Sequence, residues 1–246
     1  MEVSHYTQYF GIASYASKIA LNRLDASHVL VSYTSDVEPW DGVDTLMVDS
    51  GGYSLVNTDR TEYQTSDEEY LNYIQEHDAE YAMLRDYPLG SDPDATIPEL
   101  QRRTTEHQRR LLDRWNISTT PVAVVQGRSP RQYLNHVSQL RDAGVLERTN
   151  RVAIGSLVGR ASTEKHRIIT TVADSLGDNT RIHGLGVQVS DLSAYPQLLS
   201  LLATGDSNAW DYTTGGTWRE KAYAYLDRRQ RLADLSVGES QRRLPT

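Results

Sequence analysis

The chain has 246 residues, a formal net charge of -8 at pH 7 and no cysteine. A length of about 250 residues suits a single α/β barrel with a full core. The absence of cysteine excludes disulfides, thiolate nucleophiles and cysteine-based zinc sites. The acidic balance argues against a broad basic surface for nucleic acid. Because no membrane span or signal peptide is recognisable, we expect a cytoplasmic protein with no membrane partner.

Short β-branched runs alternate with amphipathic helices along the chain, which is typical of a parallel sheet. Capping residues and prolines mark helix starts, and glycines mark several helix ends. The strand candidates are Tyr9–Ser14, His28–Tyr33, Thr45–Asp49, Tyr81–Arg85, Pro121–Gln126, Arg151–Ser156, Arg181–Val187 and Asn208–Tyr212. Helix starts are expected at Ser66, Ser129, Ser162, Pro196 and about Arg219, and the last helix is expected to end near Leu235.

Eight strands are the number that a closed α/β barrel needs. The predicted fold is therefore an α/β, TIM-type (β/α)8 barrel that forms a single domain over residues 1–246. In this interpretation residues 1–44 supply the first strands and helices, and residues 219–246 form a C-terminal helix with a polar tail.

Polar and small residues stand at the ends of the strand candidates, where barrel enzymes build their active sites. The third strand ends in Asp49 and is followed by Ser50, Gly51 and Gly52. Glycines allow a sharp turn and bring backbone N–H groups close to a ligand, here beside a carboxylate. A simple turn capped by Asp49 explains the same pattern.

The fourth and fifth strands also end in polar side chains. Asp86 follows the fourth strand, where it would serve a site or pair with the neighbouring Arg85. Gln126 and Gly127 follow the fifth strand. A glutamine amide both donates and accepts, which suits an amide-like base edge, although it also suits bonds to nearby backbone.

The last three strand ends complete the pattern. Gly155 and Ser156 leave room above the barrel or allow close helix packing, and His183 is most simply a packing residue. Asp206 and Asp211 come near the eighth strand, where an aspartate can attack a sugar carbon or cap a turn. Each residue has a structural explanation by itself, but together they predict an enzyme active site.

Between Thr45 and Tyr212 the chain resembles the tRNA-guanine transglycosylase superfamily, which includes the DpdA-type proteins that insert 7-deazaguanines into DNA. VDSGGYS is similar to the family's DSGGFQ motif, and LRDYP is similar to the segment with the second base-binding aspartate. The resemblance implies acid–base work for Asp49 and base binding for Asp86. It also implies that the base is lined by Ser50, Gly51 and Tyr53.

Three further segments follow in the family's order. VVQG resembles VVQGG and implies base contacts from Gln126 and Gly127, and AIGSLVG resembles GGLAVGE and implies contacts from Gly155 and Ser156. GDSNAW resembles the FDSASY segment of the archaeal enzymes, which implies that the nucleophile is Asp206. Alignment with the bacterial DMFDCV segment makes Asp211 the alternative nucleophile.

Two departures from the tRNA enzymes favour the DNA-modifying branch. The chain has no cysteine for their zinc site, and it ends shortly after the barrel, so we expect no metal and no other cofactor. The implied activity replaces guanine in DNA by a preQ0-type base through a covalent aspartyl intermediate. The expected partners are DNA, a free 7-deazaguanine base and further proteins of a DNA-modification system. Phosphate contacts are expected from Arg128, Arg131, Arg160 and Arg219.

Other functions stay open at this point. Exchange on tRNA would need the same aspartates, and a glycosidase would use water instead of a second base. A non-catalytic barrel that binds a nucleobase or nucleic acid would have no need of a carboxylate beneath C1′. The three aspartates Asp49, Asp86 and Asp206 therefore favour an enzyme.

Overall fold

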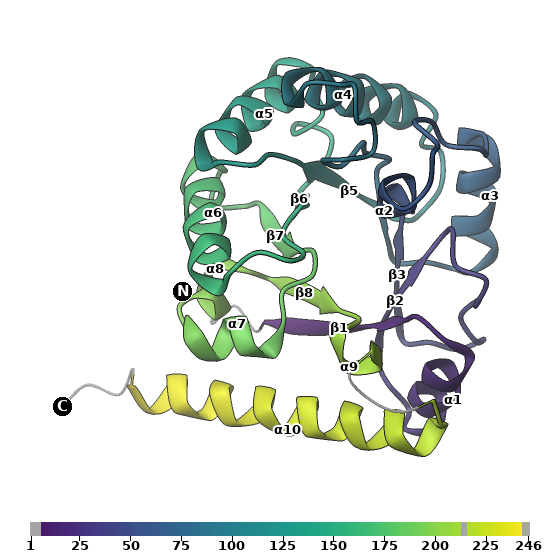
Figure 1. The fold of residues 1–246 in the computed structure, drawn as a ribbon, viewed down its shortest axis with the longest axis vertical. Helices are drawn as coiled ribbons and strands as arrows, with labels where there is room; N and C mark the ends of the chain where they lie inside the picture. Colours follow the sequence, from purple (N-terminus) through teal and green to yellow (C-terminus); the bar gives the residue numbers. More distant parts are fainter. Residues whose placement is uncertain (1–5, 213–215, 243–246) are drawn as a thin grey trace.

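Eight parallel strands close into a barrel surrounded by helices in the computed structural model, which describes residues 6–212 and 216–242, with side chains up to residue 235 (Figure 1). Strands pair in chain order, and β1 closes the barrel against β8. The strands are β1 (Thr7–Ile12), β2 (His28–Ser32), β3 (Thr45–Asp49), β4 (Tyr81–Met83), β5 (Thr120–Val125), β6 (Arg151–Ile154), β7 (Arg181–Gly184) and β8 (Thr204–Ser207). The predicted (β/α)8 barrel is confirmed.

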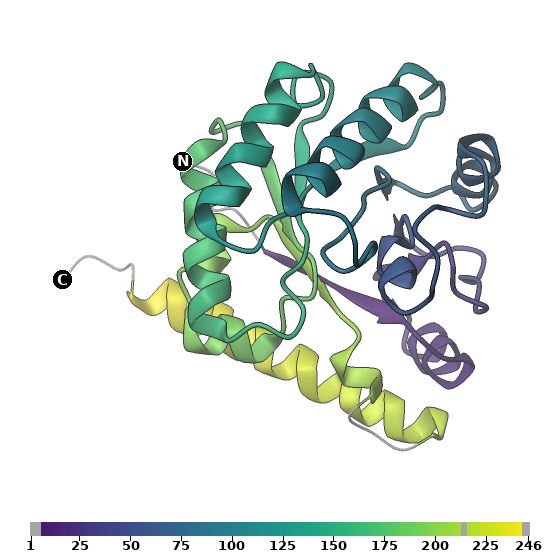
Figure 2. The same cartoon turned by 45° about the horizontal axis from the view of Figure 1, so that its top comes forward.

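The helices form a ring around the barrel, and α10 runs along one side of the molecule, packed against α1 (Figure 2). They are α1 (Tyr15–Arg23), α2 (Gly52–Val56), α3 (Asp67–Glu76), α4 (Ile97–Asp113), α5 (Pro130–Asp142), α6 (Ser162–Ser175), α7 (Val189–Ala194), α8 (Leu198–Leu201), α9 (Ala209–Tyr212) and α10 (Trp218–Arg242). The short helices α2 and α9, which directly follow β3 and β8, lie inside the ring of outer helices (Figure 1). Among the described residues, every helix is too short or too polar to cross a membrane.

Side-chain alternation along the strands decides which residues reach the barrel interior. One buried cluster contains Met47 of β3 and Val124 of β5, and the outer core between strands and helices contains their neighbours Val48 and Val125. Continuing the alternation by two residues from Met47 and Val124 leads to Asp49 and Gln126. The strand pattern therefore directs these polar side chains into the mouth of the barrel.

The eighth strand is not where the sequence predicted it. Residues Thr204–Ser207 form β8, and Ala209–Tyr212 of the predicted strand form helix α9. The segment TGDS has turn-forming residues and no apolar run, so its composition does not indicate a strand. The correction places Asp206 on a strand that pairs with β1 rather than in a preceding turn.

The last helix begins at Trp218 and continues to Arg242, so it is longer than the predicted segment from Arg219 to Leu235. A helix was expected within residues 1–44, where α1 lies, but without bounds, and no helix was predicted for the segments that form α2, α4, α7 and α9. Helix α4 is strongly polar, yet it buries Gln101 and Gln108 because their amides bond to the backbone of the β5 segment. The buried face of α4 also contains Leu100, Leu111 and Leu112, so the helix has an apolar stripe that the sequence interpretation overlooked.

Candidate active site

The three predicted aspartates lie at the mouth of the barrel and influence one another electrostatically. Asp49 ends β3, Asp86 follows β4 and Asp206 belongs to β8. Burial raises the pKa of Asp49, and the negative charge of Asp206 raises it further. Burial and the charge of Asp49 raise the pKa of Asp86 to about 7. The structure therefore brings the three carboxyl groups together at the barrel mouth, where Asp86 and Asp206 are buried and Asp49 is partly buried.

Asp86 accepts hydrogen bonds at both carboxylate oxygens. The hydroxyl of Ser50 donates to Oδ1 at 3.2 Å, and the amide of Gln126 donates to Oδ2. The hydroxyl of Ser156 in turn donates to Oε1 of Gln126. Four of the predicted base-binding residues are thus joined in one hydrogen-bonded chain, Ser156 to Gln126 to Asp86, with Ser50 on the other side.

Gly155 leaves the space that Gln126 occupies. A Cβ atom at position 155 would lie 2.6 Å from Nε2 of Gln126, a separation that real side chains do not tolerate. The carbonyl oxygen of Gly155 accepts a hydrogen bond from Tyr133 at 2.7 Å, and Gly127 also packs closely against Tyr133. Both glycines therefore allow the β5 and β6 ends to approach α5 and each other.

Asp49 is held by its own turn. Its Oδ2 accepts a hydrogen bond from the backbone N–H of Gly51 at 3.0 Å, and Gly51 has a φ of 80°, in the left-handed region that favours glycine. Burial raises the pKa of Asp49 despite this bond and despite the nearby hydroxyl of Ser32. A carboxyl group with a raised pKa is suited to carry a proton. The neighbouring Tyr53 is 57% exposed on α2, where its ring is open to a ligand.

Asp206 is held through one oxygen only. His183 contacts Oδ1 through Nε2 at 3.2 Å, and the backbone N–H of Gly186 donates to the same oxygen at 2.9 Å. The other ring nitrogen of His183 is bonded to the hydroxyl of Thr204 at 2.8 Å. No hydrogen bond from the described part of the chain reaches Oδ2. The buried carboxylate is therefore anchored through Oδ1, while Oδ2 has no hydrogen-bond partner among the described residues.

The sequence interpretation of His183 as a simple packing residue missed its contact with Asp206. The signal was available in the strand pattern, because His183 pairs with Thr204 across β7 and β8, and Asp206 comes two residues later. Alternation places Thr204 and Asp206 on one face of β8. Placing the eighth strand correctly would have brought the histidine and the aspartate together.

Asp211, the alternative nucleophile, has a different environment. It lies on α9, and its Oδ1 forms a buried ion pair with Lys221 of α10 at 2.8 Å. The hydroxyl of Ser14 also donates to Oδ1, at 3.2 Å. These contacts join α9, α10 and the start of α1, so the carboxylate serves to connect helices.

Arg160 was expected to contact DNA phosphates, but its guanidinium is used inside the protein. It donates to the carbonyl oxygens of Ser156, Arg128 and Gly127 at 2.6, 2.9 and 3.1 Å, and it pairs with Glu164. Arg160 thus connects the loops that follow β5 and β6. The other three arginines expected to contact phosphates are exposed: Arg128, Arg131 and Arg219.

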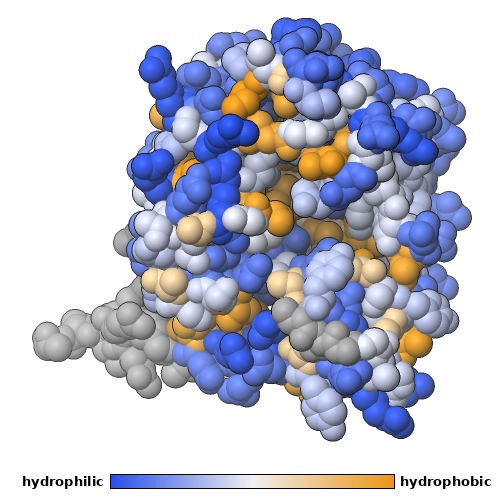
Figure 3. Space-filling model, in the orientation of Figure 1, coloured by the Kyte–Doolittle hydropathy of each residue, from blue (hydrophilic) through white to orange (hydrophobic). Residues whose placement is uncertain are grey.

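The surface of the face shown in Figure 1 is polar at its edge, with apolar atoms recessed near its centre (Figure 3). A family model described as DpdA, DeoxyPurine in DNA protein A, matches residues 11–221, which include all three aspartates of the site. The match indicates a transglycosylase that acts on DNA. No curated protein matches the chain. Since the family model covers most of the sequence, the chain belongs to the DpdA family.

Proposed function

We propose that the protein replaces guanine in DNA by a 7-deazaguanine base such as preQ0, through a covalent bond between Asp206 and C1′ of the deoxyribose. The observation that carries this proposal is the one-sided anchoring of Asp206. Two donors hold Oδ1 while Oδ2 is left without a hydrogen bond from the described residues. A carboxylate nucleophile needs this combination of fixed direction and one free oxygen.

The target nucleotide has to leave the base stack or be presented in a single strand, because C1′ and the base edge are inaccessible in a duplex. In the proposed site, Asp86 and Gln126 bind the donor and acceptor groups of the guanine edge. Their mutual hydrogen bond is exchanged for bonds to the base when it enters. Because the pKa of Asp86 is about 7, this carboxyl group can either accept from the base or donate to it.

The first half of the reaction breaks the bond between C1′ and N9. Oδ2 of Asp206 attacks C1′, and the bonding electrons move to N9 of guanine, which takes up a proton. Asp49 is the proposed source of this proton, since burial and the charge of Asp206 raise its pKa. Guanine then leaves, and the sugar stays bound to Asp206 as an ester-like intermediate.

The second half reverses these steps with a different base. N9 of the incoming 7-deazaguanine loses its proton to Asp49 and attacks C1′, and the carboxylate of Asp206 is released. Both Asp49 and Asp206 return to their starting states. No external cofactor is needed, because the intermediate retains the energy of the glycosidic bond.

A label-transfer experiment tests the proposal. The protein is incubated with radiolabelled guanine or preQ0 and, separately, with DNA or tRNA, beside the variant Asp206→Ala. Label that enters DNA with the wild type and not with the variant would support the proposal. Label in tRNA would overturn the DNA assignment, and release of guanine without entry of label would indicate a glycosidase. If no label enters either nucleic acid, a required partner protein and a non-catalytic binding barrel both stay open. The experiment is then repeated with extract of the native cells, and absence of label there as well would overturn the proposal.

A further inference from the structure

Tyr63 binds the backbone of Asp86 from a loop between α2 and α3. Its hydroxyl donates to the carbonyl oxygen of Asp86 at 2.8 Å and accepts from the N–H of the same residue at 3.2 Å. It also lies 3.2 Å from the hydroxyl of Ser50. Burial and the charge of Asp86 raise the pKa of Tyr63 well above its usual value, so the phenol keeps the proton that it donates. One side chain thus holds both polar groups of the Asp86 backbone.

The ring of Tyr63 is enclosed by three other side chains. The guanidinium of Arg85 lies over it, with Cζ 4.5 Å from the ring centroid. Tyr87 and His107 contact it edge to face, each with a centroid separation of 5.7 Å. A cation over an aromatic face and edge-to-face ring pairs are both attractive, so the ring has a defined place.

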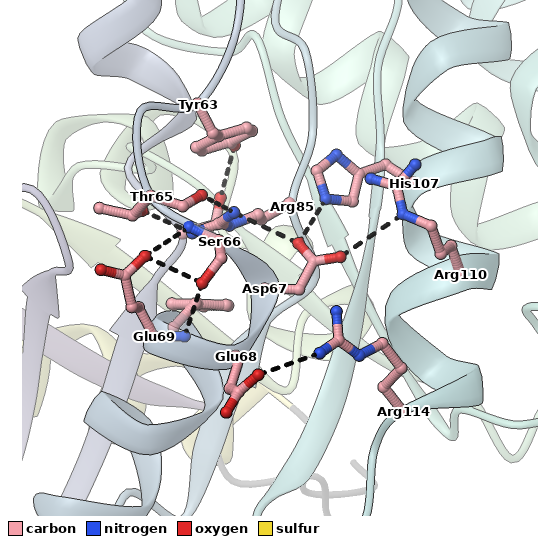
Figure 4. Close-up of polar contacts among 12 residues, drawn as sticks. Tyr63, Thr65, Ser66, Asp67, Glu68, Glu69, Arg85, His107, Arg110 and Arg114 are labelled. Carbon is pink, nitrogen blue, oxygen red and sulfur yellow. Dashed lines mark hydrogen bonds and ion pairs between the residues drawn. The ribbon is translucent and has the colours of Figure 1, made fainter.

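Arg85 is itself fixed, because its side chain is 1% exposed and strongly hydrogen-bonded (Figure 4). It donates to the carbonyl oxygen and the hydroxyl of Thr65 at 2.7 and 2.8 Å, and it pairs with Asp67 at 3.2 Å. Asp67 also accepts from His107 at 2.8 Å. Burial alone would raise the pKa of Asp67, but the bond from His107 and the charges of His107, Arg85 and Arg110 together lower it to about 2. The cluster is therefore an ion pair that stays charged at neutral pH.

Gly52 shows how closely the DSGGYS turn packs against this arrangement. A Cβ atom at position 52 would lie 2.7 Å from Oδ1 of Asp86 and 3.1 Å from the hydroxyl of Tyr63. A side chain there would displace one of the two residues. The space between the turn, Tyr63 and Asp86 is thus already filled, and small movements of Tyr63 would move Asp86.

We propose that Tyr63 is a positioning residue for Asp86, and that the Arg85–Asp67 ion pair holds Tyr63 in place. This inference rests on the proposed function, in which Asp86 binds the purine base. Tyr63 fixes the peptide groups on both sides of the Asp86 side chain, while Ser50 and Gln126 direct its oxygens. A binding group has to be held within about 0.5 Å of its productive position, and such precision comes from neighbouring residues.

The test compares Tyr63→Phe with a matched variant, Tyr70→Phe. Tyr70 also lies beside Arg85, and its hydroxyl also donates to a backbone carbonyl oxygen, that of Met83 at 2.7 Å, but it makes no hydrogen bond with Asp86. Tyr70 is fully buried and Tyr63 partly buried, so Tm is measured for both variants. The dissociation constant for labelled guanine is measured by equilibrium dialysis, together with Tm and DNA affinity. Tyr63→Phe is expected to weaken guanine binding about tenfold. Tyr70→Phe is expected to lower Tm about as much as Tyr63→Phe does, while guanine binding stays unchanged.

Two results would overturn the positioning role: unchanged guanine affinity in Tyr63→Phe, or equal weakening in Tyr70→Phe. Failure of the proposed function looks different, because then the wild type transfers no label into DNA, or it binds neither guanine nor preQ0, whatever the behaviour of the two variants. The role of Arg85 is tested by Arg85→Lys. This variant keeps the positive charge beside Asp67 but loses the planar guanidinium group whose nitrogens bond to Thr65 and Asp67. If Arg85 acts through Tyr63, the weakening caused by Arg85→Lys disappears in the Tyr63→Phe background, whereas additive effects would contradict this part.

Discussion

Asp86 and Asp206 are both buried carboxylates at the barrel mouth, exposed by 6% and 7%, but they are held in opposite ways. Both oxygens of Asp86 accept hydrogen bonds from side chains, whereas Asp206 accepts two bonds at one oxygen and none from the described residues at the other. A carboxylate bonded on both sides is fixed for recognition, and one with a free oxygen is available for attack. Hydrogen-bond distribution, more than burial, distinguishes the two proposed roles.

The two residues also differ in their supports. Asp86 lies beyond the end of β4 and depends on Tyr63, Arg85 and the loop before α3. Asp206 lies within β8 and pairs with Tyr9 of β1, so the barrel itself holds it. We call Asp86 with Gln126 the binding half of the site and Asp206 with His183 the attacking half. The Asp86 side depends on loops, whereas Asp206 is held by the sheet. Four changes would sharpen or break this distinction.

The largest effect is expected from Asp206→Asn, which should reduce base exchange at least about 10³-fold because an amide cannot attack C1′. Asp211→Asn is the matched change. It should retain exchange but destabilise the fold by about 3–5 kcal/mol, since Lys221 loses the carboxylate of a buried ion pair. Label transfer and urea unfolding measure the two effects. Loss of exchange in Asp211→Asn without loss of stability would make Asp211 the nucleophile.

Asp86→Asn should change how stability depends on pH. The pKa of Asp86 is raised to about 7 in the folded protein, so between about pH 4 and pH 7 the folded state binds a proton that the unfolded state has lost. Stability from this group therefore falls as pH rises through that window. The variant lacks this loss, so its stability relative to wild type should increase from pH 5 to pH 8 by on the order of 2 kcal/mol. Urea unfolding at the two pH values checks this, and an equal difference at both would contradict it.

His183→Ala should slow exchange about 10- to 100-fold, with little change in guanine affinity. The substitution removes one of the two donors to Oδ1 of Asp206 and leaves the Asp86 side untouched. His183→Gln should recover part of the rate because its amide can donate to the same oxygen. Separate measurements of kcat and KM for the free base test the prediction. A rise in KM with an unchanged kcat would place His183 in the binding half instead.

The smallest effect is expected from Gly155→Ala, whose new Cβ atom would press on the side chain of Gln126. Guanine binding should weaken about tenfold, a cost of ~1.4 kcal/mol, while the attacking half stays intact. Gly177→Ala is the control, because a Cβ atom there meets no atom within 4 Å. Equilibrium dialysis compares the two variants. Equal affinities would show that Gln126 can move without loss of binding.

The sequence was most informative where local pattern and position in the barrel coincide. Asp49 and Gln126 could be placed at the mouth because each ends a short apolar strand and the strand alternation is regular. Such strands are recognised from local residues alone. The same reasoning failed for β8, because a strand of Thr, Gly, Asp and Ser has the composition of a turn.

The residues that support the site could not be predicted in this way. Tyr63 lies in a loop, and its place depends on Arg85, on a ring from the β4 end and on a histidine from α4. These contacts join segments that are distant in the sequence, so the periodicity of apolar residues along the chain does not predict them. The same holds for Arg160, whose charge suggested DNA although its donors bind neighbouring loops.

Closure of the barrel by β1 and β8 has a consequence for how the protein is made. Asp206 belongs to the last strand and is paired with the first, whereas Asp49, Asp86 and Gln126 come from earlier strand ends. During translation a growing chain acquires the residues proposed for base binding well before the one proposed for attack. A copy cut or stalled before β8 would therefore lack the proposed nucleophile, so damaged or unfinished molecules would be unable to carry out the proposed exchange.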